Sequence, residues 1–419
     1  MINVPGDESR PGTESRKLLD VEDLITAGAQ LPPLPPQKWS KGQGRQQAAY
    51  LCYSSGTSGP PKGVMISHWN IIANVIQMTL YESTFRSKGH SDVILGVLPQ
   101  SHIYSIVLTT HVPVFRADTV VTMRKFELTS FVRAIKKYQM TLLYVAPPIL
   151  VTLIKQGALA KDTRDFDLPS VRRIFCGAAP LSEELSSQIR KRYPGVLLGQ
   201  GYGMTESATV ISSHPKDVYD GSSGCIVPGM DIRIVDSDGN DVTGPNKRGE
   251  LLAKGPNITL GYYKNKKATQ ETFGGGWLRT GDEVEIRLHP QTKDPHLFIV
   301  DRVKELIKVS GFQVAPAELE GHLLGHPFVS DCAVIPVPDD RSGEVPKAFV
   351  VLRKDVTLDH ATVEQNLKDW VAQHKSKHKH LRGGVTFIPK VPKSPTGKIL
   401  RRFLRDQEKA RLSKEMARL

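Results

Sequence analysis

From residue 50 onward, the order of apolar and polar positions alternates short β-rich runs with amphipathic helical segments. Buried strands are predicted at Val93–Leu98, Thr141–Ala146 and Val171–Phe175, which are short runs rich in large or β-branched apolar residues. Helices are predicted among them at Phe131–Tyr138 and Ser182–Arg192. Strands that alternate with helices in this way predict an α/β fold, with mainly parallel β-sheets and crossover helices.

The pattern changes near Asp231, where a β-rich subdomain is expected. The strand-like run Ile232–Asp236 is followed by Asp238-Gly239, a hairpin turn signal, and Gly249–Lys254 is predicted as the next strand.

After Asp301 the pattern predicts a small α+β domain. It has strands at Ser330–Val337 and Lys347–Leu352 and a helix around Ala361–His374, one face of which carries Val363, Leu367, Trp370 and Val371. A last helix is predicted from Ile399 to Leu412. The expected organisation is therefore a polar, Pro-containing lead-in, a large core domain and a mobile C-terminal domain, at residues 1–48, 49–300 and 301–419.

The lead-in contains a proline-rich stretch, Leu31–Pro36. An extended connector into the first strand is the favoured interpretation, and a polyproline ligand for an SH3-like domain is the alternative.

The composition of the chain restricts the classes of protein to which it can belong. The chain has 419 residues and a formal net charge of +13, which favours polyanionic partners: nucleic acid, an acidic membrane or a phosphorylated small molecule. No apolar run approaches the ~18–20 residues of a membrane-spanning helix, and the polar N-terminus lacks the apolar segment of a secretory signal. The cysteines are scattered without a CxxC pair, which predicts reduced thiols in an intracellular protein: Cys52, Cys176, Cys225 and Cys332.

The strongest chemical signal is the segment Tyr53–Val64, with the sequence YSSGTSGPPKGV. Its glycines allow a backbone to turn closely around phosphate oxygens, its hydroxyls add donors, and Lys62 supplies a mobile positive charge. It is not the loop of P-loop NTPases, because Pro61 precedes the lysine and Gly63 follows it. A flexible Ser/Gly linker is the alternative, and the strand-like Ala49–Tyr53 before it argues against that.

This segment resembles the phosphate loop of the acyl-adenylate-forming (AMP-binding) superfamily, which includes 4-coumarate:CoA ligases, acyl-CoA synthetases and beetle luciferases. Six further segments resemble motifs of that family and occur in the family's order. They are Leu98–Ile103, Gly177–Leu181, Gly199–Glu206, Trp277–Asp282, Asp301–Glu320 and Pro392–Ile399. The resemblance covers about residues 48 to 402 and implies an ATP-dependent ligase that makes an acyl-AMP and transfers the acyl group to coenzyme A (CoA).

The resemblance implies a nucleotide site. Tyr202 lies against adenine, with Gly201 and Gly203 leaving room for close approach. Thr205 donates to the α-phosphate, and Glu206 is a carboxylate ligand suited to Mg²⁺. Asp282 and Arg302 clamp the ribose, with a surface ion pair as the alternative. The remaining residues expected at the nucleotide are Ser54, Ser55, Gly56, Thr57, Ser58, Lys62, Ala178, Gln200, Lys304, Gln313 and Lys398.

Two lysines are expected to serve the two half-reactions. Lys398 bridges the carboxylate and the α-phosphate, which offsets the repulsion between two anions and stabilises the transition state. In the family, the C-terminal domain then rotates about a hinge that matches Lys304, so that Lys398 leaves and Lys308 enters. Gly311 and Lys125 match positions near CoA, although an ordinary surface lysine is equally consistent with Lys125.

The acyl pocket is expected at His102, Tyr104, Gly177 and Gly203, and a buried structural role is the alternative for His102. The expected substrate is an aromatic or medium-chain carboxylic acid, in secondary metabolism. Relatives usually have an apolar or aromatic pair where this chain has Gln100-Ser101, which affects the shape of the pocket.

This chain differs from the family at its N-terminal end, where only about 50 residues precede the segment that resembles the phosphate loop. A longer upstream reading frame, or a specialised or catalytically impaired nucleotide-binding remnant, would account for this. Acyl transfer to a carrier protein and nucleic-acid binding are further alternatives. The basic tail lacks interleaved aromatic residues, so no nucleic-acid partner is expected.

The chain ends with Ala417-Arg418-Leu419, which has the physical pattern of the peroxisomal signal Ser-Lys-Leu. A peroxisomal import receptor is therefore an expected partner. The expected location is the peroxisome, with the cytoplasm as the alternative.

Overall fold

A computed structural model describes residues 2–3, 19–54, 61–84, 86, 89, 91–159, 166–214, 220–394 and 397–416. By its contacts the chain divides into two compact units, Met1–Gln43 and Gly44–Leu419. No helix among these residues is long and apolar enough to cross a lipid bilayer. The predicted domain boundaries at residues 48 and 300 stay predictions.

The N-terminal unit contains a helix that the sequence analysis did not predict. Strand β1 (Ile2–Asn3) pairs in parallel with β2 (Leu19–Asp20), and helix α1 (Val21–Ala29) follows. The Asp20 carboxylate accepts the Asp23 amide at 2.7 Å, and the Asp23 carboxylate accepts the Asp20 amide at 3.2 Å. This reciprocal capping box starts the helix. The stretch Leu31–Pro36 forms neither helix nor strand.

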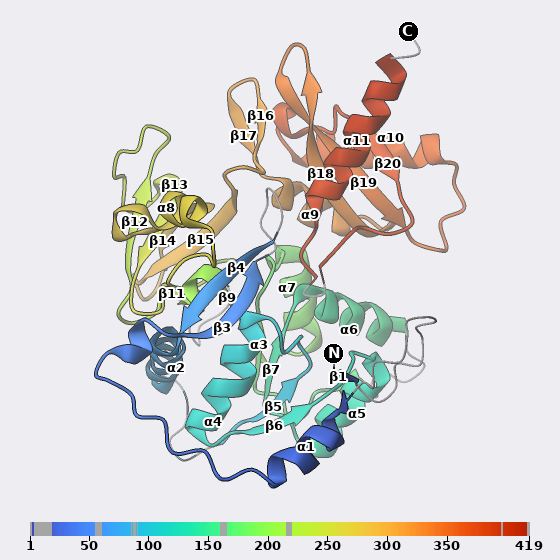
Figure 1. The fold of residues 1–419 in the computed structure, drawn as a ribbon. Coiled ribbons are helices and arrows are strands. Elements are labelled where there is room, and N and C mark those ends of the chain that lie inside the picture. The colour runs from blue at the N-terminus through green and yellow to red at the C-terminus, as the bar shows by residue number, and fades with distance from the viewer. Residues whose placement is uncertain are drawn as a thin grey trace, which may run out of the picture. The chain divides into compact units, whose positions relative to one another are not determined.

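A seven-stranded sheet forms the centre of the larger unit (Figure 1). Its order is β11-β10-β9-β8-β7-β5-β6, and the strands from β6 to β9 are parallel, whereas β10 and β11 are antiparallel. The predicted mainly parallel sheet is confirmed. The strands are β5 (Val93–Gly96), β6 (Thr119–Thr122), β7 (Leu142–Val145), β8 (Arg173–Cys176), β9 (Leu197–Met204), β10 (Thr209–Ser213) and β11 (Cys225–Ile226).

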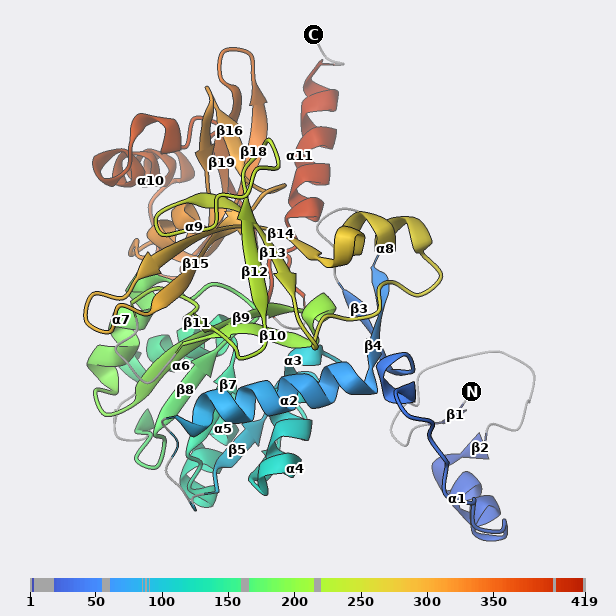
Figure 2. The ribbon, with the colours of Figure 1, turned by 90° about the vertical axis from the view of Figure 1, so that its left-hand side faces the viewer.

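The two faces of this sheet bury two hydrophobic cores because side chains alternate along each strand. In β7, Leu142 and Tyr144 face one core, while Leu143 and Val145 face the other. One face packs against α5 (Leu128–Tyr138), α6 (Pro147–Leu159) and α7 (Glu183–Arg192). The other face packs against α2 (His68–Ser83), α3 (Ile103–Ser105), a π-helix η2 (Ile106–His111) and α4 (Val112–Arg116), and Figure 2 shows α2 lying along it.

The candidate phosphate segment belongs to a β-hairpin. Strand β3 (Ala48–Ser54) pairs antiparallel with β4 (Lys62–Ser67), and Ser54 is directly opposite Lys62. The hairpin therefore brings together the two ends of the loop that carries the predicted glycines and hydroxyls. The predicted residues Ser55, Gly56, Thr57 and Ser58 lie outside the described residues.

The predicted β-rich subdomain is a four-stranded antiparallel sheet. The turn at Asp238-Gly239 follows its first strand, and the carboxylate of Asp236 accepts the backbone amides of Asp238 and Asn240, both at 2.9 Å. The elements are β12 (Asp231–Val235), β13 (Arg248–Lys254), β14 (Leu278–Leu288) and β15 (Pro295–Arg302), with α8 (Lys266–Phe273) between β13 and β14.

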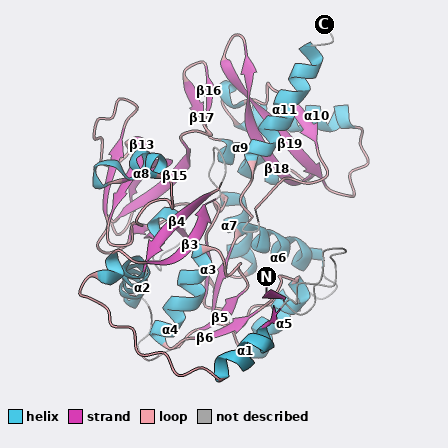
Figure 3. Cartoon of the chain, in the orientation of Figure 1, coloured by secondary structure: helices cyan, strands magenta, loops and turns pink. Residues whose placement is uncertain are grey.

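The C-terminal domain is a separate α+β domain (Figure 3). In helix α10 (His360–His374), Val363, Leu367 and Val371 are completely buried, and Trp370, the fourth residue of the predicted face, is half-buried. The strands are β16 (Ile307–Val309), β17 (Phe312–Val314), β18 (Val329–Asp339), β19 (Gly343–Leu352) and β20 (Val385–Phe387). The helices are α9 (Pro316–Leu324), α10 (His360–His374) and α11 (Arg401–Met416).

Candidate active site

A cavity of about 800 Å³ lies at the carboxyl ends of the parallel strands. Its lining includes the loop after β5 with His102, the turn after β8 with Gly177, and the end of β9 with Tyr202. Because parallel strands end at one edge of a sheet, their following loops meet there and form a ligand site. The loop before α11 contributes Ser394 and Lys398 from the C-terminal domain.

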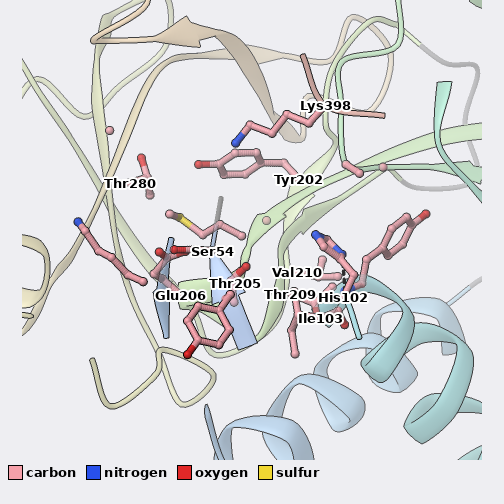
Figure 4. A pocket seen from close by; sticks show the side chains of 18 of the residues that line it. Ser54, His102, Ile103, Tyr202, Thr205, Glu206, Thr209, Val210, Thr280 and Lys398 are labelled. Carbon is pink, nitrogen blue, oxygen red and sulfur yellow. Dashed lines mark hydrogen bonds between the residues drawn. The ribbon is translucent and has the colours of Figure 1, made fainter. Parts of the chain in front are cut away.

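The structure brings most of the predicted site residues to this cavity. Figure 4 shows the side chain of Lys398 reaching over Tyr202, with Ser54, Thr205 and Glu206 on one side and His102 on the other. The predicted residues that line the cavity are Ser54, Lys62, His102, Tyr104, Gly177, Ala178, Gly201, Tyr202, Gly203, Thr205, Glu206, Arg302, Lys304 and Lys398.

Tyr202 and Arg302 line one wall of the cavity, and both contact Asp282, which is not among the described lining residues. The Tyr202 hydroxyl donates to Asp282 Oδ2 at 2.6 Å, and Arg302 Nε lies 3.5 Å from Asp282 Oδ1. Asp282 and Arg302 are directly opposite on the neighbouring strands β14 and β15. Burial raises the pKa of Asp282, although the charge of Arg302 and the hydrogen bond from Tyr202 oppose this. The buried carboxylate therefore fixes both the tyrosine ring and the guanidinium at the cavity wall.

The two glycines beside Tyr202 are needed for packing within the protein. A Cβ atom at Gly201 would lie 2.2 Å from the Phe175 ring, and one at Gly203 would lie 1.5 Å from the Thr209 carbonyl oxygen. The sequence predicts that Gly201 and Gly203 allow the close approach of a ligand. The structure adds a reason internal to the fold, because any side chain at these positions would separate β9 from its neighbours.

Glu206 is a buried carboxylate in the cavity wall, with 5% of its surface exposed. The Tyr262 hydroxyl donates to Glu206 Oε1 at 2.8 Å, and the Lys62 ammonium lies 4.8 Å from the centre of the Tyr262 ring. A carboxylate offers about four acceptor positions, and Tyr262 occupies one. Glu206 therefore fits the oxygen ligand that a hard cation such as Mg²⁺ prefers.

Two hydrogen bonds to Ser394 hold the backbone of Lys398 ahead of α11. The Ser394 amide donates to the Lys398 carbonyl at 2.8 Å, and the Lys398 amide donates to Ser394 Oγ at 3.2 Å. Burial, together with the charge of Arg302, lowers the pKa of Lys398 to about 8, against the opposing effect of Glu305, Asp282 and Glu206. Lys398 therefore loses its proton at a lower pH than an exposed lysine does.

His102 and Tyr104 lie at the other side of the cavity. His102 Nδ1 accepts the Tyr104 amide at 3.2 Å and so caps the start of α3. Burial and the nearby charge of Lys398 lower the pKa of His102, which favours the neutral imidazole. The Tyr104 hydroxyl donates to the Phe175 carbonyl at 3.1 Å, and its ring packs against Gly177, where a Cβ atom would lie 3.1 Å from it.

The structure places other predicted residues elsewhere. Gln200 is buried, its amide oxygen accepts the Leu181 amide at 2.6 Å, and its amide nitrogen donates to Ser223 Oγ at 3.1 Å. Among the described residues, Gln200 is therefore not part of the cavity lining. Lys125 is exposed before α5. Lys308, Gly311 and Gln313 are exposed on the β16–β17 hairpin of the C-terminal domain.

Several residues of the cavity wall were not predicted. Tyr262 belongs to no motif that the sequence analysis used. Arg279 and Thr280 lie inside the segment Trp277–Asp282, from which only Asp282 had been chosen. Arg279 forms an ion pair with Glu250 across β13 and β14, and Thr280 Oγ1 donates to the Leu251 carbonyl at 2.8 Å. The position of Arg279 and Thr280 inside a family motif was the sequence feature that could have identified them as lining residues.

Comparisons with known proteins point to one family. The family described as AMP-binding enzyme matches residues 6–263, and the AMP-binding enzyme C-terminal domain matches residues 318–398. The acyl-CoA ligase lcsD of Purpureocillium lilacinum is 44% identical over 356 residues, which is 84% of this chain and 90% of that protein.

Other relatives are longer than this chain. The probable 4-coumarate–CoA ligase 3 of Dictyostelium discoideum is 40% identical over 86% of this chain but only 63% of its own length. The crystal structure of ATP-bound MatB from Rhodopseudomonas palustris superposes with a TM-score of 0.78 at 26% identity and covers 92% of this chain and 72% of that protein. The chain therefore spans less than two thirds of some curated relatives.

Proposed function

Because this chain belongs to the AMP-binding enzyme family, we propose that it is an AMP-forming acyl-CoA ligase, which activates a carboxylic acid with ATP and transfers the acyl group to CoA. The observation that carries the proposal is the position of Lys398. It enters from the C-terminal domain the same cavity that contains Lys62, Thr205 and Glu206 of the core. A cation there faces the region in which a carboxylate and a nucleotide phosphate would meet.

In the first half-reaction, a carboxylate oxygen attacks the α-phosphorus of ATP, and the bond to pyrophosphate breaks. Both reactants are anions, so the reaction needs positive charge between them. Lys398 supplies that charge, and the cations Lys62 and Arg302 also line the cavity. Positioned charges in a partly buried site stabilise a developing negative charge without rearranging solvent.

Magnesium is part of the proposal, with Glu206 as its protein ligand. The buried carboxylate has acceptor capacity left beyond its bond with Tyr262. When bound, the ion would neutralise phosphate charge. Tyr262 holds Oε1 of the carboxylate and so leaves Oε2 to bind the ion.

In the second half-reaction, the CoA thiol attacks the acyl carbonyl carbon, and AMP leaves with the electrons of the broken C–O bond. We assign Lys308, Gly311 and Lys125 to CoA, and Lys304 to a hinge in the turn after β15. The apolar and aromatic lining at Ile103, Tyr104, Phe175 and Val210 supports an aromatic or medium-chain acid.

Trapping of the acyl-AMP tests this proposal. Purified protein is incubated with ATP, Mg²⁺, hydroxylamine and a panel of aromatic and medium-chain acids, and hydroxamate and pyrophosphate are measured. We expect both products in equal amounts with at least one acid, and an acyl-CoA when CoA replaces hydroxylamine. A folded protein that forms neither product, yet binds ATP, would instead be an impaired nucleotide-binding protein.

We propose in addition that the chain is imported into peroxisomes. The supporting signal, Ala417-Arg418-Leu419, lies outside the described residues. A fluorescent protein fused to the N-terminus should collect in puncta with a peroxisomal marker, and deletion of Arg418 and Leu419 should disperse it. A diffuse intact fusion beside a punctate marker would contradict the import and favour the cytoplasm.

A further inference from the structure

Two completely buried histidines and an aspartate lie together outside the cavity. His214 follows β10, Asp220 lies in the segment before β11, and His296 belongs to β15. One ligand atom from each, a ring nitrogen or a carboxylate oxygen, lies within 4.8 Å of the other two. Among the described residues that line the cavity, these three do not occur. The cluster is therefore separate from the proposed nucleotide site.

Asp220 lies between the two imidazoles. His214 Nε2 is 3.3 Å from Asp220 Oδ1, and His296 Nδ1 is 2.7 Å from Asp220 Oδ2. Ligands of a tetrahedral zinc ion at ~2.0 Å lie about 3.3 Å apart. Two of the distances are thus within about 0.6 Å of this spacing, and all three ligand atoms lie within 4.8 Å of one another.

Hydrogen bonds satisfy His296 only in part. Its Nδ1 contacts Asp220 and, at 3.2 Å, Ser222 Oγ, whereas its Nε2 has no hydrogen-bond partner among the residues that the structure describes. A buried ring nitrogen without a partner carries a desolvation cost. Of the two ring nitrogens, Nδ1 thus lies beside Asp220, and the buried Nε2 keeps unused bonding capacity.

We propose that His214, Asp220 and His296 bind a divalent transition-metal ion of the Zn²⁺ type. Imidazoles with one carboxylate are a donor set that zinc and ferrous iron accept, whereas Mg²⁺ and Ca²⁺ prefer oxygen ligands only. The ion is structural, because it joins the end of β10 to β15, and through them the seven-stranded sheet to the four-stranded sheet.

The backbone already connects these elements at the same place. The Leu297 amide donates to the Gly224 carbonyl at 2.8 Å, and the Ser223 amide donates to the Leu297 carbonyl at 2.7 Å. The histidine ligands are thus presented by paired backbone, which limits their motion and favours a rigid site. The imidazole of His289 lies tilted by 32° against that of His296, with ring centres 4.9 Å apart, and is not one of the three ligands.

Metal analysis of the full, untagged chain tests the site. The protein is stripped with a chelator, loaded with Zn²⁺ or Co²⁺ in the presence of excess Mg²⁺, freed from unbound ion and analysed by mass spectrometry for metals. We expect stoichiometric binding, visible absorption bands of tetrahedral Co²⁺, and a higher melting temperature with Zn²⁺ than with Mg²⁺ alone. Wild-type protein without bound ion would overturn the site and leave a His–Asp ion pair.

Matched variants separate this site from other metal-binding groups. Asp220→Asn keeps the shape of the side chain, and we expect it to lower the affinity more than ~100-fold, because loss of an outer-shell partner alone costs ~10–100-fold. His289→Gln and Glu206→Gln should keep wild-type affinity. Equal binding by wild type and Asp220→Asn would place the ion elsewhere, for example on the histidines at 374–380, and refute the proposal. If Asp220→Asn does not fold, the number of metal ions bound per wild-type chain decides whether the site exists.

Discussion

Lys398 is a cation in a largely buried position. The nearby carboxylates of Glu305, Asp282 and Glu206 offset only part of the free-energy cost of burying its charge. Burial is the main reason that its pKa falls to about 8, and Arg302 adds to the effect. The side chain needed for charge neutralisation in the proposed reaction therefore loses its proton at a pH not far above neutrality.

A pH dependence of adenylation follows from this value. The kcat/KM of pyrophosphate release reports the free enzyme, so it should fall above about pH 8, roughly 10-fold per pH unit once Lys398 is neutral. Lys398→Arg should remove this fall, although at a lower rate, since an arginine stays charged. The measurement is a pH profile of both proteins. An identical alkaline fall in Lys398→Arg would assign the titration to another group.

The lowered pKa of Lys398 also makes the stability of the fold depend on pH, in the direction opposite to that of the activity. Because the folded-state pKa of Lys398 lies below its unfolded value of 10.5, the unfolded chain binds more protons between about pH 8 and 10.5. The unfavourable contribution of this buried charge is therefore fully present below pH 8 and is relieved as the pH rises through that window. Activity and this part of the stability change in opposite directions.

At the scale of elements, the position of Lys398 depends on the start of α11. Arg401 Nη1 lies 2.5 Å from Glu305 Oε2 in the turn after β15, and Arg401 Nη2 lies 2.6 Å from Glu320 Oε2 in α9. Both carboxylates are buried, with 5% and 6% exposed. The Arg401 guanidinium thus joins the start of α11 to α9 and to the turn after β15. Arg401 is only three residues from Lys398 in the sequence.

Removal of this guanidinium should destabilise the C-terminal domain. Arg401→Ala leaves two buried carboxylates without their partner, and breaking a buried ion pair from one side costs about 3–5 kcal/mol. Its neighbour Arg402 is exposed, and its pair with Asp406 is 3.9 Å long, so Arg402→Ala should cost less than about 1 kcal/mol. Urea unfolding followed by circular dichroism measures both. Equal midpoints for the two variants would contradict the anchoring role.

Most elements were predictable because their signals are local. The strands near residues 94, 143 and 174 and the buried face of α10 follow from apolar periodicity, and the structure confirms them. The helix α1 was missed, although Asp20 and Asp23 carry a capping-box pattern. The structure leaves Gln200 out of the described cavity lining, because its side-chain oxygen accepts from Leu181 and its side-chain nitrogen donates to Ser223. A position within a motif does not reveal such contacts.

At the scale of the whole molecule, the site depends on contacts between residues far apart in sequence. Tyr262 holds Glu206, and the His214–Asp220–His296 cluster joins two sheets. No periodicity or single motif predicts such contacts, since each partner is an ordinary residue in its own segment. The relation of Lys398 to the core is of the same kind, because a separate domain brings it to the cavity.

The structure presents only one of the two proposed catalytic lysines to the cavity. Lys398 lines it, whereas Lys308, on the exposed β16–β17 hairpin, is not among the described lining residues. If the C-terminal domain rotates about Lys304 between half-reactions, this arrangement corresponds to adenylation. The two lysines should then affect different steps, although they belong to the same domain.

Separate assays of the half-reactions test this division. Lys398→Ala should slow acyl-AMP formation more than ~100-fold, since a positioned cation contributes several times the ~1.4 kcal/mol that a factor of ten requires, yet it should spare thioester formation from synthetic acyl-AMP and CoA. Lys308→Ala should show the reverse. Lys354→Ala, an exposed lysine of the same domain, serves as the matched control and should leave both rates unchanged. Equal losses in both half-reactions for Lys398→Ala and Lys308→Ala would mean that the lysines act in one arrangement of the domains, and the rotation would have to be abandoned.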